Sequence, residues 1–191
     1  GLFVTAHVYV PEGPGPFPAV VSPIGHYYDH GKADTRASTR AHGLAKQGVL
    51  TLVYDAFGQG ERDRGGHGHR VHWRLGLTGR TNLTLMVWDT VRAVDYLETR
   101  GDVDPARIGV TGASGGGLNS LYAALLDPRL KLSAPAVYVT QFEAQLRSRI
   151  PHGSCAVLPG LAGFTNAGEI AGLLAPRPLL LLAGTRDRYF P

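Results

Sequence analysis

The stretch Gly112-Ala113-Ser114-Gly115-Gly116 decides the fold. The stretch follows an apolar run that predicts a buried strand. Its last two residues begin a segment, residues 115–126, that predicts a helix. Flanking glycines are needed at such a turn because neighbouring backbone comes close to the serine Cβ. The turn exposes the serine oxygen and places the Gly115 amide at a helix N-terminus, where it can donate to an oxyanion. We therefore predict that Ser114 is a nucleophile and not merely a cap for the helix.

Composition and charge limit the class of protein that the chain can be. The 191 residues suffice for one domain with a real core, so residues 1–191 are treated as a single domain. A net charge of +4, with the basic residues scattered apart from one loop, does not favour nucleic-acid binding. The single cysteine, Cys155, rules out an internal disulfide, and no apolar run approaches the length of a membrane span. Localisation and oligomeric state stay open.

The two ends of the chain both look cut. Gly1 opens the chain without a Met or a signal peptide, and Pro191 closes it directly after a loop begins. We therefore expect a fragment of a longer protein whose fold is C-terminally incomplete.

Short apolar runs alternate with amphipathic stretches along the chain. Strands are expected at residues 2–10, 19–24, 49–54, 108–111, 132–139 and 178–183, and helices at residues 35–47, 82–99 and 115–126. Of the strands, the first is expected to be antiparallel and the last buried. Residues 55–80 are expected to form a long polar loop, and residues 140–175 a cap or pocket insertion. This order predicts an α/β fold, a three-layer sandwich of a mostly parallel sheet with helices on both faces.

Acyl transfer also needs a base and a group that orients it. In hydrolases with this turn the chain order is serine, acid, histidine. Asp187 follows the last expected strand and is the predicted acid. All eight histidines precede Asp187, so the catalytic histidine is expected beyond Pro191. His152 is a conceivable substitute, but chain order favours a pocket-lining or surface role for it.

A second oxyanion donor is expected from the loop after the first central strand, at residues 25–32. A glycine followed by a residue whose N–H points into the site fits Gly25-His26. We therefore assign the His26 backbone amide, with the Tyr27 amide as the second choice, and we expect Tyr27 to contact substrate. The His26 imidazole either contacts substrate or has a surface or packing role.

Basic residues crowd the long loop. They are Arg62, Arg64, His67, His69, Arg70, His72 and Arg74. A solvated loop near the pocket rim is favoured over a metal site or a patch for an anionic substrate. Cys155 lacks an elbow context and is expected to be a small buried or pocket residue. No metal and no organic cofactor is expected.

Several segments in consistent order resemble a known group of α/β-hydrolases. The segments are Gly25-His26-Tyr27, 55–62, 89–97, 103–117, 175–178 and 184–191. They are similar to acetyl xylan esterases and cephalosporin C deacetylases, which are related to dienelactone hydrolases. Phe57 stands where the deacetylases usually carry an arginine or a similar residue. The resemblance implies a serine esterase with Ser114 as nucleophile, Asp187 as acid, and oxyanion amides from His26 and Gly115.

The resemblance predicts a carboxylic ester hydrolase that deacetylates small or carbohydrate esters through an acyl-enzyme. Its expected partner is a small-molecule ester substrate. Two alternatives stay open: a serine peptidase of the prolyl-oligopeptidase type, and a hydrolase-fold fragment that is catalytically incompetent because its base is missing.

Overall fold

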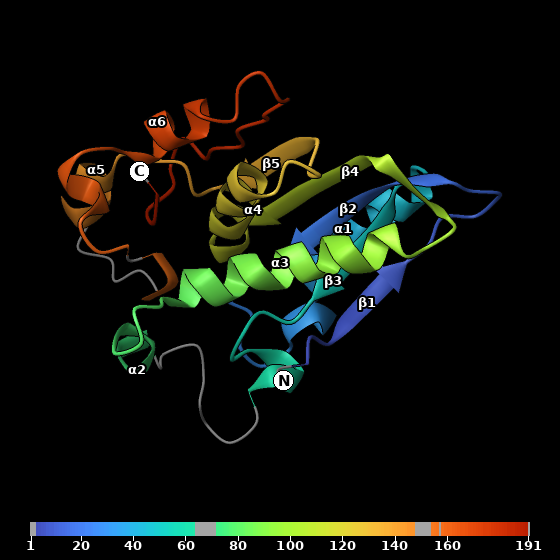
Figure 1. Cartoon of the computed structure of the whole chain (residues 1–191), viewed down its shortest axis with the longest axis horizontal. Coiled ribbons are helices and arrows are strands. Elements are labelled where there is room, and N and C mark those ends of the chain that lie inside the picture. Colours follow the sequence, from blue (N-terminus) through green and yellow to red (C-terminus); the bar gives the residue numbers. More distant parts are fainter. Residues whose placement is uncertain (1–2, 64–71, 148–153, 157, 191) are drawn as a thin grey trace.

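The computed structural model describes residues 3–63, 72–147, 154–156 and 158–190. Its centre is a five-stranded sheet in the order β1-β3-β2-β4-β5 (Figure 1). The strands are β1 (Ala6–Tyr9), β2 (Phe17–Pro23), β3 (Leu50–Tyr54), β4 (Val103–Ala113) and β5 (Leu132–Ala136). β1 is antiparallel to β3, and β2, β3, β4 and β5 are mutually parallel. This pairing confirms the expected sheet, including its antiparallel first strand.

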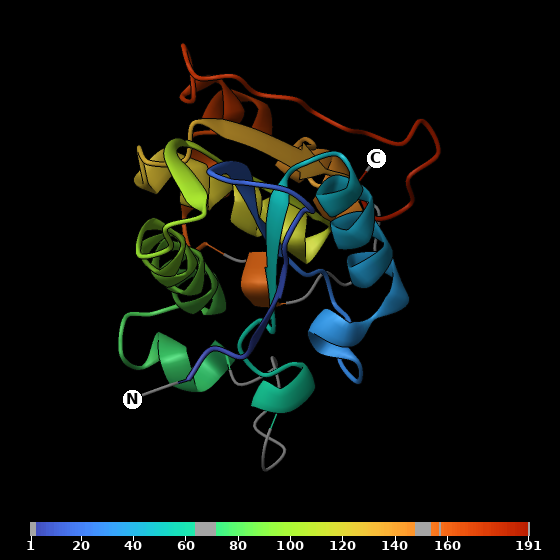
Figure 2. The ribbon, with the colours of Figure 1, turned by 90° about the vertical axis from the view of Figure 1, so that its right-hand side faces the viewer.

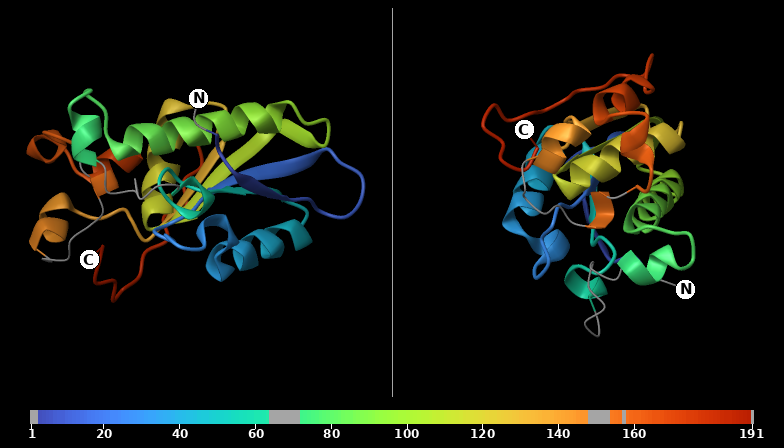
Figure 3. Two further views of the ribbon diagram at one scale, coloured as in Figure 1. Left: turned by 90° about the horizontal axis from the view of Figure 1, so that it is seen from below. Right: turned by 90° about the vertical axis from the view of Figure 1, so that its left-hand side faces the viewer.

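Helices cover both faces of the sheet (Figures 2 and 3). The helices are α1 (Thr35–Lys46), α2 (His72–Gly76), α3 (Asn82–Glu98), α4 (Gly115–Leu126), α5 (Phe142–Arg147) and α6 (Ala167–Gly172). Short 3-10 turns lie at η1 (Gly31–Ala33), η2 (Gly60–Arg62), η3 (Ser154–Ala156) and η4 (Leu161–Gly163). α1 packs on one face, and α3 and α4 pack side by side on the other. The predicted three-layer α/β sandwich is therefore confirmed.

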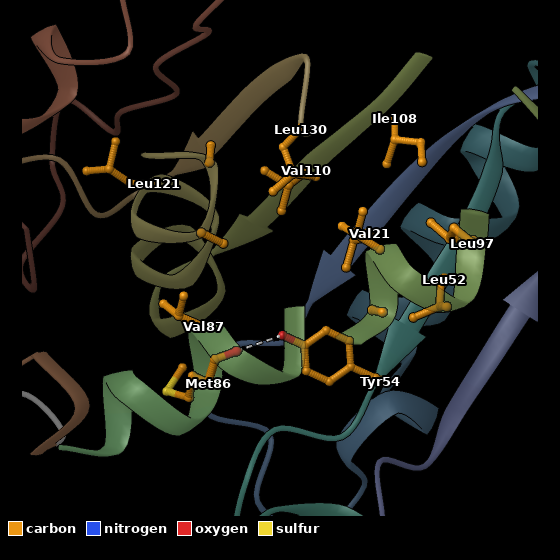
Figure 4. Close-up of a cluster of buried hydrophobic side chains, with 14 of the residues drawn as sticks. Val21, Leu52, Tyr54, Met86, Val87, Leu97, Ile108, Val110, Leu121 and Leu130 are labelled. Carbon is orange, nitrogen blue, oxygen red and sulfur yellow. Dashed lines mark hydrogen bonds between the residues drawn. The ribbon is translucent and has the colours of Figure 1, made fainter. Parts of the chain in front are cut away.

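The larger core lies between the sheet and the α3–α4 pair (Figure 4). Alternate strand residues point into it because side chains of a strand alternate between the two faces. Members that Figure 4 labels include Val21, Leu52, Val110, Leu97 and Leu121, each no more than 2 % exposed. Burying one such side chain stabilises the fold by about 1.5–3 kcal/mol. A smaller cluster under α1 joins the opposite face of the sheet.

A buried polar network fixes α3 and α4 against β3. The Asn119 amide donates to the Tyr54 hydroxyl at 2.8 Å and to the Met86 carbonyl oxygen at 3.1 Å. The hydroxyls of Tyr54 and Thr90 are 2.7 Å apart, and Figure 4 also shows the longer bond from Tyr54 to Met86. Burial raises the pKa of Tyr54, so the hydroxyl stays protonated. Because Asn119 lies on α4, this network helps to position the helix that carries the serine turn.

Two expectations about the sheet need correction. Residues 178–183 do not form a buried strand. Isolated bridges at Leu179 and Leu182 and four backbone hydrogen bonds join the segment to residues 133–137, but Leu180 is 54 % exposed. The segment lies at the open edge of the sheet, where no described element covers its outer side. β5 also ends earlier than expected, because Val137 turns the chain with a φ of 47°.

The described parts of the polar segment 55–80 contain more regular structure than expected. They contain the 3-10 turn η2 and the short helix α2. Segment 140–175 contains α5, η3, η4 and α6, a mixture that agrees with its irregular sequence.

Candidate active site

Ser114 occupies a strained turn between β4 and α4. Its φ of 58° and ψ of −119° are unusual for a residue with a side chain. The Ser114 amide donates to the Ala136 carbonyl oxygen at 2.9 Å, and the Ser114 carbonyl oxygen accepts from the Leu118 amide at 2.9 Å. The side chain makes no capping hydrogen bond to the helix. The backbone therefore fixes the turn, and the serine oxygen is not needed to hold it.

The glycines around Ser114 are required by close backbone contacts. A Cβ on Gly112 would lie 2.5 Å from the Pro23 carbonyl oxygen, and one on Gly116 would lie 2.3 Å from the same atom. Gly117 is confined in the same way by the Ala136 carbonyl oxygen, at 2.5 Å. Because real Cβ atoms do not approach oxygen this closely, only glycine fits. The predicted steric role of the flanking glycines is confirmed.

A cavity of about 510 Å³ lies over Ser114 at the carboxyl ends of β2, β4 and β5. Its lining residues are His26, Tyr27, Tyr28, Arg36, Ala113, Ser114, Gly115, Leu118, Val137, Tyr138, Cys155, Ala156, Tyr189 and Phe190. The structure therefore brings the predicted Ser114, Gly115, His26 and Tyr27 to one cavity. This edge of the sheet is where a parallel α/β topology predicts a site.

Gln59 and Gly60 hold the loop that carries His26. The Tyr27 amide donates to Gln59 Oε1 at 2.8 Å and to the Gly25 carbonyl oxygen at 3.0 Å. The Gly60 amide donates to the Tyr28 carbonyl oxygen at 2.9 Å. Since the Tyr27 amide already donates to these two oxygens, the structure favours His26 over this second choice, and the oxyanion role stays a prediction.

Asp55 joins the same loop to the end of β3. Its buried carboxylate accepts from the Lys32 amide and from Lys32 Nζ, each at 2.7 Å, and from Thr5 Oγ1 at 2.6 Å. Burial disfavours the charged lysine, but hydrogen bonds to Asp55 and Glu61 outweigh this and raise the pKa of Lys32. The carboxylate lies against Gly31, where a Cβ would come within 2.0 Å of Asp55 Oδ1. The loop is therefore fixed at both of its ends.

The His26 ring lies beside the first turn of α4. A Cβ built on Gly115 would be 3.1 Å from His26 Cε1, so the ring and the Gly115 backbone are in contact. Amides of a first helical turn have no partner within the helix, which leaves the Gly115 N–H suited to an oxyanion. Cys155 Sγ also contacts this ring, at 3.3 Å from His26 Nε2. Burial raises the pKa of Cys155 to about 12, and the expectation of a buried pocket residue is confirmed.

Asp187 shapes a turn next to the cavity. Its Oδ1 accepts from the Tyr189 amide at 2.8 Å and from the Phe190 amide at 3.1 Å. The cavity wall in the described part of the chain includes Tyr189 and Phe190 but not Asp187. The acid role of Asp187 stays a prediction, and His152 lies outside the described residues.

Sequence reasoning missed an aromatic wall opposite the His26 loop. Tyr138 is buried, and its ring meets Phe190 edge-on with centroids 5.7 Å apart. Burial raises the pKa of the Tyr138 hydroxyl, which stays neutral. Its neighbour Val137 carries the second strained backbone of the cavity. Both residues directly follow β5. Because sites of parallel α/β sheets form at the carboxyl ends of strands, this position in the sequence could have identified them.

The basic loop is only partly described. Arg62 was expected to be solvated, and this expectation is wrong. Its side chain forms a buried ion pair with Asp89 and donates to the Asp55 carbonyl oxygen at 2.9 Å. Burial raises the pKa of Asp89, and the Arg62 guanidinium opposes that rise. Residues 64–71 of the loop, with most of its histidines, lie outside the described residues. Across the described ranges, no cluster of three His, Cys, Asp or Glu residues could hold a metal ion, and no helix is long and apolar enough to cross a membrane.

A mostly parallel sheet between helical layers, with a strained serine turn directly after β4 and before α4, defines an α/β-hydrolase fold. Comparison with known proteins places the chain more narrowly. Residues 2–148 match the family model described as "Glucuronyl esterase, fungi". The chain therefore belongs to the glucuronyl esterase family, and the expected relation to α/β-hydrolase esterases is confirmed.

Relatives of known sequence are longer than this chain. YtaP of Bacillus subtilis (strain 168), which is named as a hydrolase, is 34% identical over 188 residues, covering 93% of this chain and 62% of YtaP. A 4-O-methyl-glucuronoyl methylesterase of Schizophyllum commune (strain H4-8 / FGSC 9210) is 26% identical over 165 residues, covering 72% of this chain and 42% of that enzyme. The chain thus spans less than two thirds of either relative.

Solved structures agree with the fold. Methylesterase BT1017 superposes with a TM-score of 0.77 and 29% identity, covering 99% of this chain and 40% of that one. The acetyl xylan esterase from Paenibacillus sp. R4 superposes with a TM-score of 0.70 and 24% identity, covering 98% of this chain and 66% of the other. The second similarity concerns the fold alone.

Proposed function

We propose that the protein is a serine carboxylic ester hydrolase that acts on carbohydrate esters. The observation that carries this proposal is the strained Ser114 turn facing a cavity at the carboxyl edge of the sheet. A backbone conformation of this kind costs about 1–3 kcal/mol, and it persists where the surrounding structure enforces it for a function. Membership of an esterase family and relatives named as methylesterases support the same activity.

The proposed chemistry begins with attack of Ser114 Oγ on the ester carbonyl carbon. The carbonyl oxygen gains negative charge, and the backbone amides of Gly115 and His26 are proposed to donate to it. The alcohol leaves with a proton, and an acyl group stays on Ser114. Water then attacks this acyl-enzyme and releases the acid, which restores the serine.

The proton transfers need a base, which the chain order places after Asp187 in sequence. We propose Asp187 as the acid that orients this base and stabilises its protonated form. The turn that Asp187 holds also presents Tyr189 and Phe190 to the cavity. Asp187 therefore has two possible effects on activity: it shapes the cavity through these hydrogen bonds, and it is proposed to orient the base through its charge.

The walls of the cavity suit a sugar ring carrying an ester. Tyr27, Tyr138 and Phe190 offer aromatic faces, and the Arg36 guanidinium lies 4.1 Å from the centroid of the Tyr27 ring. Aromatic rings stack on the apolar faces of sugars, while guanidinium groups donate to their oxygens. We propose that Tyr27 contacts the carbohydrate and that segment 140–175 shapes the pocket through Cys155 and Ala156.

Replacement of the nucleophile tests the proposal. We expect Ser114→Ala, measured on the full-length protein, to lower turnover of p-nitrophenyl acetate and of a methyl glucuronate ester by about ten-thousandfold or more. Ser120→Ala is the matched control, because Ser120 lies on the same helix, its hydroxyl donates to the Gly116 carbonyl oxygen, and it is not among the described residues that line the cavity. Equal activity of the Ser114→Ala variant and the unmodified protein would refute the proposal.

A further inference from the structure

A second and larger cavity, of about 940 Å³, lies along the side of α3 next to α4. Its walls come from α3, from Tyr122 and Leu126 of α4, and from Val4 and Leu158. It shares no described lining residue with the cavity over Ser114. The rings of Tyr122 and Tyr138, whose centroids are 6.4 Å apart, line one cavity each. The two cavities are therefore neighbours with separate walls.

Much of the α3 cavity is apolar and open to ligands. Trp88 lies in its wall and is 59% exposed, whereas Met86, Val94 and Leu97 of the same helix are buried in the core. Leu126 of α4, which is 71% exposed, and Leu83 and Val87 of α3 extend the apolar surface. An exposed tryptophan in a concave apolar wall is a favourable surface for an aromatic ligand.

The charges of the cavity are mainly positive. Asp89 is neutralised by Arg62, since the two side chains are 7% and 6% exposed and form an ion pair. Arg92 is 56% exposed in its side chain and pairs with Asp95, outside the cavity wall. Arg80 forms no ion pair within the part of the chain that the structure describes. The wall thus carries three guanidinium groups and one carboxylate.

We propose that the α3 cavity binds a carboxylate with an aromatic body. The aromatic ring stacks on Trp88 and displaces water from the apolar wall, while the carboxylate accepts hydrogen bonds from Arg80 and, more weakly, from Arg92. Guanidinium groups match the planar carboxylate with paired donors. A small, strongly hydrated anion such as inorganic phosphate has no apolar part to bury and fits this wall poorly.

Calorimetric titration with 3-phenylpropanoate tests the site, with 3-phenylpropanamide as the neutral control. We expect the carboxylate to bind and the amide to bind more weakly. Arg80→Gln should weaken binding of the carboxylate about fivefold and leave the amide unaffected. Trp88→Leu should weaken both ligands, by about tenfold, because the stacking surface is lost. Arg80 and Trp88 are exposed, so neither variant is expected to disturb folding.

Matched variants in the other cavity decide where the ligand binds. Arg36→Gln removes an arginine from the wall over Ser114, and it should leave the affinity for 3-phenylpropanoate unchanged, as should Ser114→Ala. Loss of binding in Arg36→Gln with none in Arg80→Gln would overturn the proposal, as would equal binding of the amide or of inorganic phosphate. None of these outcomes depends on esterase activity, so the site and the proposed function can fail independently.

Discussion

The two sides of the Ser114 cavity are built in different ways. On one side, the serine turn and loop 25–32 are fixed by backbone contacts and by the buried side chains of Gln59 and Asp55. On the other side, segment 178–190 joins the sheet through isolated bridges and a few backbone hydrogen bonds, and the Asp187 carboxylate accepts from the Tyr189 and Phe190 amides of its own turn. The proposed nucleophile and the proposed oxyanion donors thus lie on a fixed framework, whereas the proposed acid lies on a single edge segment.

The acid side can be tested without changing its turn. Asp187→Asn keeps the Oδ1 acceptor for the Tyr189 and Phe190 amides but removes the negative charge. We expect kcat for p-nitrophenyl acetate to fall by about ten-thousandfold, because an uncharged partner cannot stabilise a protonated base. Unchanged near-UV circular dichroism would show that the aromatic turn is intact. A loss of less than tenfold would contradict the acid role.

On the side of the serine turn, a substitution is expected to destabilise the protein through steric conflict. Gly116→Ala places a methyl group against the Pro23 carbonyl oxygen, where backbone has to move. We expect the free energy of unfolding to fall by about 1–3 kcal/mol, with loss of esterase activity. Gly43→Ala is the control: Gly43 lies inside α1 with open space around it, so the change should stabilise the protein by about 0.5–1 kcal/mol. Urea unfolding curves of both variants measure the difference, and equal shifts would contradict the steric account.

Loop 25–32 should respond to loss of its anchor. Gln59→Leu removes the acceptor of the Tyr27 amide, which leaves a partly buried N–H with only its longer bond to Gly25. We expect kcat/KM to fall about tenfold, mainly through kcat, because the His26 amide would be displaced from its proposed position at the oxyanion.

Two companion variants separate positioning from stability in this loop. Gln59→Glu keeps an acceptor oxygen and should recover part of the activity. Gln47→Leu, at the exposed end of α1, should have no effect. A change confined to KM would show that Gln59 does not position the loop for catalysis.

The start of α1, directly after this loop, gives the smallest expected effect. Hydrogen bonds from Arg36 hold the pKa of Asp34 at about 2, below its ordinary value of 3.8. Because the pKa is lowered in the folded protein, the stabilisation is present above about pH 4 and is lost as the pH falls towards 2. Asp34→Asn keeps the cap of α1. It should reduce the change in the free energy of unfolding between pH 2 and 5 by under about 1 kcal/mol. Thermal unfolding between pH 2 and 5 measures it, and an unchanged slope would contradict the assignment.

Features set by local sequence were predictable. The elbow glycines, α3 and α4 follow from steric and periodic patterns within a few residues, and the structure has them at the expected positions. The order of parallel strands then brought His26 and Ser114 together.

Features set by distant packing were not predictable. Burial of Arg62 depends on Asp89, and the engaged Tyr27 amide depends on Gln59, more than 25 residues away in each case. Residues 178–182 are exposed at the edge of the sheet, although they were expected to be buried. The expectation came from their composition, because Pro-Leu-Leu-Leu-Leu is typical of a core strand. Composition reports the hydrophobicity of a segment but not which element covers it.

The central claim, that Ser114 is a preorganised nucleophile, is tested most directly by trapping the acyl-enzyme. The protein is mixed with p-nitrophenyl acetate, quenched in acid, digested and analysed by mass spectrometry. We predict one acetyl group on the peptide that contains Ser114 and none on that peptide in the Ser114→Ala variant. An acetyl group on another residue, together with full turnover by Ser114→Ala, would contradict the claim.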